Sequence, residues 1–321
     1  MGMSFQRGKC AIGAVLLALG LVVFDTGSAH AESLSFRALS PAQVDLPGSV
    51  ETIATERFTG REGPDLELAL SDALGSVQIE GQSWFRVVPT GSPLAGDGPD
   101  AVMRGSLSRE VTRPQVNPRT ESVCVERDEN DKCVERDRVE IPCREMRVRL
   151  TPRILLFTLD GRQLYSRSDS FAASRRYCQG DDWPSANAMT AALIDDVAHA
   201  VRFDLAPVDQ VLSLRIMERR KGLKGDARDA FKAAVKLSNS DQAASCEAFA
   251  ALYQQHSDQS SVIYNHGLCQ ERGGDLEAAR TLYLETLRVD PGRDYAEQGL
   301  ARIAGHQRAR EQVKRGLGDG A

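Results

Sequence analysis

The chain has 321 residues, of which 26% are charged and 41% are hydrophobic, and its net charge is −5 at pH 7. A mildly acidic chain is a poor candidate for binding nucleic acid or anionic membranes, so these two function classes are set aside. The length predicts about two domains once an N-terminal leader is removed.

The first 31 residues have the layout of a secretory signal peptide. Arg7 and Lys9 form a basic region, residues 11–24 are apolar, and residues 29–31 (AHA) fit a small-residue cleavage site. The apolar run is shorter than the roughly 20 residues that span a bilayer, which disfavours a membrane anchor. We therefore expect an exported protein, periplasmic or envelope-associated, with no transmembrane segment after cleavage.

Residues 32–217 are expected to form one α+β domain. Their patterns predict strands at 50–58, 83–89, 101–111 and 208–216, a hairpin at 146–171, and helices at 64–77 and 187–207. In the hairpin, hydrophobic residues alternate with Arg147, Arg149 and Arg153, which indicates a sheet with one covered face. The order of elements predicts two helices packed against a mostly antiparallel sheet.

Cysteines gather in a charged insertion at about 112–143, where about every second residue near Cys124 and Cys133 is charged. Six cysteines follow the leader, and an even number in an exported chain favours disulfides. No C-x-x-C spacing occurs, which disfavours a zinc knuckle or a thioredoxin-type site. The six residues are expected to pair locally, as Cys124–Cys133, Cys143–Cys178 and Cys246–Cys269.

The second of these pairs depends on the hairpin register. A two-residue turn at Asp160-Gly161 would place Cys143 directly opposite Cys178. That turn would make them a hydrogen-bonded pair, which suits a bridge less well, so we also expect a bulge near Pro142.

Residues 218–321 are expected to form helices that repeat with a period of 34, the spacing between Phe249 and Tyr283. Small residues recur on the first helix of each unit and an aromatic residue on the second, which resembles the tetratricopeptide repeat. A further helix from 294 to 315 would cap the array. The residues expected to pack the repeats are Ala233, Phe249, Gly267, Ala279, Tyr283 and Pro291.

The resemblance to the repeat family implies a groove that holds an extended peptide or a helix. Tyr264, Asn265 and Gln270 are the candidates to line it, and a purely structural role for them is equally compatible with the pattern.

The first half also resembles a known family. The run from PAQVDLPGSVETIATERFTG (41–60) through LELALSDAL (66–74) to SWFRVVP (83–89) is similar to the CsgG-like family of the curli secretion channel and to the amino-terminal domain of TolB-type proteins. This resemblance spans about residues 41–216 and implies a role in envelope assembly. The insertion at 118–143 is too charged for a membrane hairpin, so a channel is not implied.

No pattern in the sequence indicates catalysis, a cofactor or a metal. The histidines after the leader are scattered without metal-ligand spacing. Asp195 and Asp196 are adjacent on a predicted helix, so their side chains point about 100° apart and do not share a site. We therefore expect a non-catalytic adaptor that mediates protein–protein interactions in cell-envelope or surface-structure assembly through its repeats. The alternative is a sensor or binding module whose α+β domain captures a small molecule or an envelope polymer.

Overall fold

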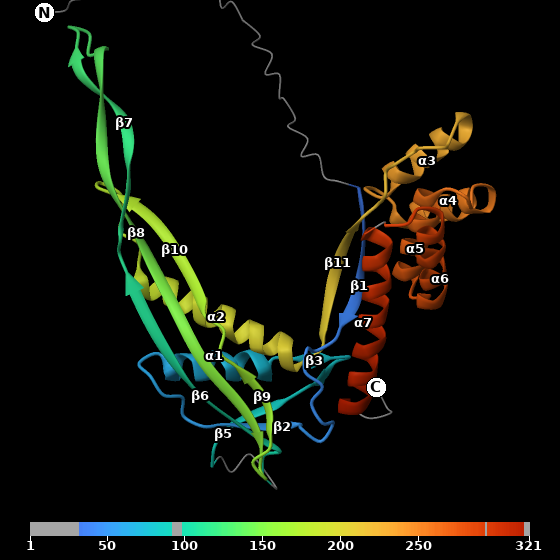
Figure 1. The fold of residues 1–321 in the computed structure, drawn as a ribbon, viewed down its shortest axis with the longest axis horizontal. Helices are drawn as coiled ribbons and strands as arrows, with labels where there is room; N and C mark the ends of the chain where they lie inside the picture. Colours follow the sequence, from blue (N-terminus) through green and yellow to red (C-terminus); the bar gives the residue numbers. More distant parts are fainter. Residues whose placement is uncertain (1–31, 92–97, 293, 318–321) are drawn as a thin grey trace, which may run out of the picture.

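The computed structural model describes residues 32–91, 98–292 and 294–317. The expected signal peptide at 1–31 lies outside the described residues, as does most of the loop before residue 101. The described chain has an α+β half, a helical half, a two-stranded ribbon beside the helices and a long hairpin arm that projects from the α+β half (Figure 1).

A mixed seven-stranded sheet forms the base of the α+β half. Its main path runs β10-β8-β6-β2-β5, and β7 and β9 also pair with β8. Strand β2 is parallel to both of its neighbours, and the remaining pairs are antiparallel. The strands are β2 (Thr52–Thr55), β5 (Arg86–Pro89), β6 (Ala101–Thr112), β7 (Gln115–Arg127), β8 (Cys133–Thr158), β9 (Gln163–Arg167) and β10 (Phe171–Cys178), and the short β3 (Gln78–Ile79) and β4 (Gln82–Ser83) pair with each other.

Two helices, α1 (Gly63–Gly75) and α2 (Ala186–Leu205), cover one face of this sheet (Figure 1). Helix α1 buries Leu66, Leu70 and Leu74, the stripe of every fourth residue that predicts it. The side chains that β8 directs toward the helices are buried, whereas its alternating arginines are exposed on the open face. The helices and the one-sided covering of the hairpin are thus confirmed.

The expected fold class is nevertheless wrong. The sheet is mixed rather than mostly antiparallel, because β2 lies parallel to β5 and β6. The strand expected to close the sheet, β11 (Val208–Arg215), instead pairs with β1 (Ser33–Ser40) in a separate ribbon. Alternation along β11 reports one covered face but not which surface covers it. The arrangement is therefore not the CsgG-like sheet that the sequence resemblance implies.

The β1–β11 ribbon packs against the helical half. Leu34 of β1 and Ile216, which follows β11, are buried in the same core as Phe231, Val262 and Ile303 of the helices. Strand β1 contacts both α5 and α7. The first described strand therefore belongs to the core formed by the last third of the chain.

Five helices form the helical half, and each packs on the next. They are α3 (Gly225–Leu237), α4 (Gln242–Gln255), α5 (Ser260–Gly273), α6 (Leu276–Val289) and α7 (Asp294–Leu317). The side chains of Asp241 and Asp275 cap α4 and α6 by accepting hydrogen bonds from backbone N–H groups in the first turn. Gly274 ends α5 in the left-handed conformation, with a φ of 85°. Local chemistry thus sets the turns between the helices.

The expected repeat packing needs one correction. Ala233 is exposed, and its neighbour Ala234 is the buried small residue of α3. In the second unit, Gly267 has the expected place: a Cβ there would meet the ring of Tyr283 at 3.1 Å. Phe249, Ala279 and Tyr283 are fully buried, and Pro291 follows the end of α6.

Helix α7 joins the two halves. Its first half contributes Ala296 and Ile303 to the core of the helical half, whereas Val313 near its end is buried in the core of the α+β half. Gln312 accepts a hydrogen bond from the N–H of Ala42 at 2.8 Å and donates one to the carbonyl oxygen of the same residue at 3.2 Å. The ring of Trp84 lies against Gly316 so closely that a Cβ there would meet it at 2.4 Å. Among the described residues, no helix is long and apolar enough to cross a membrane.

Candidate functional site

The residues expected to line a peptide groove hold the protein's own chain instead. Asn265 is fully buried. Its Oδ1 accepts from the N–H of Met217 at 2.8 Å, and its Nδ2 donates to the carbonyl oxygen of Met217 at 3.0 Å. Tyr264 is buried between the rings of Tyr283 and Tyr295. Gln270 is half-buried beside His266 on the same helix. The segment after β11 therefore packs against α5 at the place where a peptide was expected.

A groove lies between the β1–β11 ribbon and the helices. It has a volume of about 710 Å³. One wall consists of β1 and β11, with Phe36, Leu212 and Leu214, and the other consists of α7 and the turn between α5 and α6. We call this the ribbon groove. It combines an apolar wall with polar side chains, which is typical of binding sites in proteins.

A partly buried ion pair lines the ribbon groove. Arg302 donates to Glu271 through Nε at 2.9 Å and through its terminal nitrogen at 2.8 Å. The hydroxyl of Tyr283 donates to the same carboxylate. Burial raises the pKa of Tyr264 to about 12, and burial followed by the charge of Glu271 raises the pKa of Tyr283 above its ordinary value. The negative charge of Glu271 is thus neutralised by Arg302, and both tyrosines stay neutral at physiological pH.

The rim of the ribbon groove is cationic. Arg272, Arg308 and Arg310 contribute three positive charges, and Glu271 is the only carboxylate among the described residues that line the groove. His306 accepts a hydrogen bond from the N–H of Leu39 through Nδ1 at 3.3 Å, which fixes the end of β1. Burial, followed by the charge of Arg310, lowers the pKa of His306. The groove therefore favours an occupant that carries negative charge.

Three disulfides are present, and they are the three pairs expected from the sequence: Cys124–Cys133, Cys143–Cys178 and Cys246–Cys269. The first closes the tip of the arm formed by β7 and residues 133–142 of β8. The second lies at the base of this arm, and the third joins α4 to α5. The bonds are consistent with an exported protein.

The register at Cys143 and Cys178 is right, although the turn that predicted it is wrong. Thr158 bonds to Arg162 around a three-residue loop, and a bulge follows in β9. The bulge offsets the longer loop, so Cys143 and Cys178 stay opposite each other. The N–H of Gln179 donates to the carbonyl oxygen before Cys143 at 3.0 Å, which makes the cysteines a non-hydrogen-bonded pair. Such a pair brings the side chains closer together, as a bridge requires.

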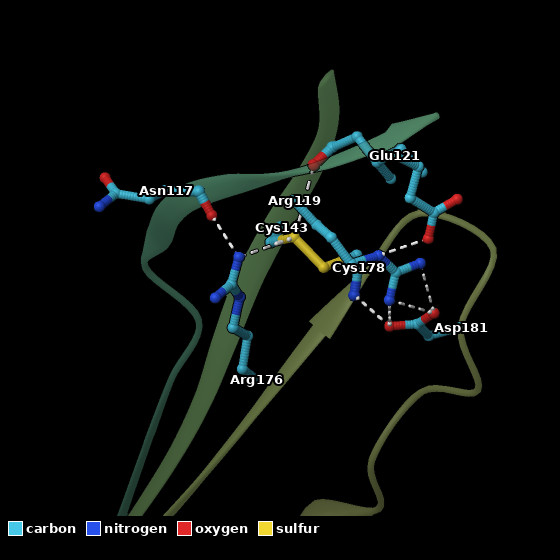
Figure 2. The surroundings of a disulfide bond; sticks show 8 residues. Asn117, Arg119, Glu121, Cys143, Arg176, Cys178 and Asp181 are labelled. Carbon is cyan, nitrogen blue, oxygen red and sulfur yellow. Dashed lines mark hydrogen bonds and ion pairs between the residues drawn. A yellow bond between two sulfur atoms is a disulfide. The ribbon is translucent and has the colours of Figure 1, made fainter. Parts of the chain in front are cut away.

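Polar contacts hold the arm at its base beside the Cys143–Cys178 disulfide (Figure 2). Arg119 of β7 binds the carboxylate of Asp181 at 3.2 Å, and Asp181 also accepts from the N–H of Cys178 at 2.9 Å. This backbone hydrogen bond, followed by Arg119, lowers the pKa of Asp181. Arg176 donates to the carbonyl oxygen of Asn117 at 2.8 Å. The arm is thus fixed to β10 and to the loop that follows it.

The sequence matches no family model and no curated protein. Among solved structures, two crystal forms of the PelC dodecamer from Paraburkholderia phytofirmans are similar to this chain. Each match covers 53% of this chain and 98% of the PelC chain, with 11% sequence identity and a TM-score of 0.23. A similarity at that TM-score supports no statement about function.

The ribbon groove is not evident from the sequence, because β1, which forms part of one wall, is not among the predicted strands. The arginines of α7 lie in the predicted capping helix and are visible in the sequence. Their gathering at a groove depends on the ribbon, which pairs strands that are far apart in the chain.

Proposed function

We propose that this chain is a non-catalytic, exported adaptor that binds an acidic segment of a partner protein in the ribbon groove. The observation that carries the proposal is the unmatched positive charge of the rim, since the one lining carboxylate is already bound by Arg302. The apolar wall of the ribbon would contact the hydrophobic side chains of such a segment. The partner would be a protein of the cell envelope, and the compartment would be the bacterial periplasm.

The helical half is proposed to be a short tetratricopeptide array. Its consecutive helix pairs and the contact of Gly267 with Tyr283 support this assignment. In this chain the ribbon and the Met217 segment pack against the helices, where other arrays of this kind would bind a peptide. The partner would therefore bind between the ribbon and α7 rather than along Tyr264 and Asn265.

Binding of two labelled peptides tests the proposal. One octapeptide alternates glutamate with leucine, and its control alternates lysine with leucine. We expect fluorescence anisotropy to show saturable binding of the acidic peptide alone, and this binding should weaken as salt rises from about 50 to 300 mM. Replacing Arg308 and Arg310 by glutamate should weaken it by about tenfold or more. Equal binding of both peptides would contradict the proposal.

A matched pair of variants locates the site. Ala301 and Ala304 are both exposed on α7, but only Ala301 lines the ribbon groove. Ala301→Trp should fill the groove and abolish peptide binding, whereas Ala304→Trp should leave it unchanged. A photo-cross-linker placed at each position in cells would then capture the partner from position 301 only. Binding that survives Ala301→Trp would place the site elsewhere.

A further inference from the structure

Another, smaller cavity is lined by residues at the base of the arm. The arm lies far from the β1–β11 ribbon in the fold (Figure 1). The cavity has a volume of about 280 Å³ and is bounded by β7, β8, β10 and the loop between β10 and α2. The Cys143–Cys178 disulfide forms part of its wall. Its polar and aromatic lining side chains include Gln115, Arg144, Tyr177, Gln179 and Trp183.

Trp183 presents an unusually open indole at this cavity. Its exposed fraction is 73%, the highest among the exposed large hydrophobic side chains of the described residues. The helix start that follows does not need it, since the side chain of Ser185 caps α2. The indole contacts the ring of Tyr177, with centroids 5.4 Å apart and planes at 45°. The exposed surface of the Trp183 indole thus remains free for a ligand.

Tyr177 supplies a polar group that lacks a partner. Its side chain is only 5% exposed, and no group in the described part of the chain bonds to its buried hydroxyl. Buried hydroxyls are nearly always hydrogen-bonded, because leaving one unpaired is unfavourable. Tyr177 lines the cavity next to Trp183, so its ring lies beside the place where a ligand stacked on the indole would bind. A bound polar molecule would provide the missing partner.

The remaining lining indicates the chemistry of that molecule. Gln115, Arg144 and Gln179 are exposed around the cavity and offer planar groups with several N–H donors. The cavity has no carboxylate among its described lining residues, so it has no counter-ion for a cation. An aromatic face beside planar hydrogen-bonding groups fits a ligand with one apolar face and a polar edge. A sugar ring has this shape.

We propose that this cavity binds a neutral sugar residue of a glycan, which stacks on Trp183 and hydrogen-bonds to the Tyr177 hydroxyl. A proline-rich peptide fits less well. Such peptides dock in grooves lined by aromatic side chains, whereas the rings of Trp183 and Tyr177 contact each other and leave no gap between them. The proposal does not depend on the ribbon groove.

Tryptophan fluorescence provides the test, because the chain has only two tryptophans and the other, Trp84, is half-buried beside α7. The full chain is titrated with neutral trisaccharides of glucose and of N-acetylglucosamine, and with hexaproline as the competing ligand. We expect saturable changes with at least one trisaccharide and none with hexaproline. Binding of hexaproline alone, or of nothing, would overturn the proposal.

Variants assign the residues, with binding followed by calorimetry so that the signal does not depend on the indole. Trp183→Ala should weaken trisaccharide binding by about tenfold or more. Phe203→Ala, which removes a 47% exposed aromatic side chain on α2, should leave it unchanged. Ala301→Trp should also have no effect, which separates this site from the ribbon groove. Unchanged affinity in Trp183→Ala would refute the stacking.

Tyr177→Phe gives a signature that a merely structural tyrosine would not. The variant removes an unpaired buried hydroxyl, so the melting temperature of the ligand-free protein should stay the same or rise. The same variant should weaken trisaccharide binding by about fivefold, because the ligand loses its hydrogen bond. A lower melting temperature, or an unchanged affinity, would exclude the role assigned to this hydroxyl.

Discussion

Replacing Asn265 by alanine should loosen the attachment of the ribbon to the helices. The amide of Asn265 makes both hydrogen bonds to Met217, at 2.8 and 3.0 Å, and both residues are buried. Alanine would leave one N–H and one carbonyl group of the backbone without a partner. Each unpaired buried group costs about 1–3 kcal/mol, so we expect the free energy of unfolding to fall by about 2–6 kcal/mol.

Equilibrium urea denaturation followed by far-ultraviolet circular dichroism would measure this loss. Gln270→Ala on the same helix is the control, since its half-exposed amide bonds only weakly to His266, and its effect should stay within about 0.5 kcal/mol. If Asn265→Ala is as stable as the unmodified protein, the Met217 segment is not held by this amide. Other contacts would then have to hold this segment against α5.

Three further outcomes are expected. Gly299→Ala should lower the melting temperature, because its Cβ would meet the buried ring of Tyr283 at 2.5 Å, whereas Gly273→Ala, which meets nothing within 4 Å, should not lower it. Removing the bond between α4 and α5 with Cys246→Ser should cost about 2–4 kcal/mol in urea denaturation. Burial lowers the pKa of His266, so the unfolded chain binds more protons, and stability should fall as pH drops below about 6.5. His266→Gln should reduce this loss of stability between about pH 7.5 and 5.5, measured by urea denaturation at each pH. If the loss is the same in the variant, groups other than His266 cause it.

Local features of the fold could be predicted from the sequence. The stripe of leucines in α1 and the alternation in β8 depend only on residues a few positions apart, so the hydrophobic pattern predicts these elements directly. The pairing of Cys143 with Cys178 could also be predicted, although the loop has three residues rather than two. The bulge in β9 offsets the extra loop residue, so the register at the cysteines is the expected one.

Features that depend on distant contacts could not be predicted. The partner of strand β1 lies far along the chain, with Ser33 opposite Arg215. Nothing local indicates that β11 would leave the sheet to meet it. In α3 the small residue that packs is Ala234 rather than Ala233, because the first helix of that unit is offset by one residue relative to the second unit. A fixed period cannot reveal such an offset.

The ribbon groove exists because the two ends of the described chain cross. Strand β1 leaves the α+β half to pack on the helices, and α7 leaves the helices to pack on the α+β half. The junction is held by Gln312 bound to Ala42 and by Arg315 bound to Asp45 at 2.9 Å. Because the walls of the groove come from the ribbon and from α7, its width depends on how these two elements pack. An occupant that binds both walls would therefore stabilise this packing, and the apparent melting temperature of the whole chain should rise with the concentration of the occupant.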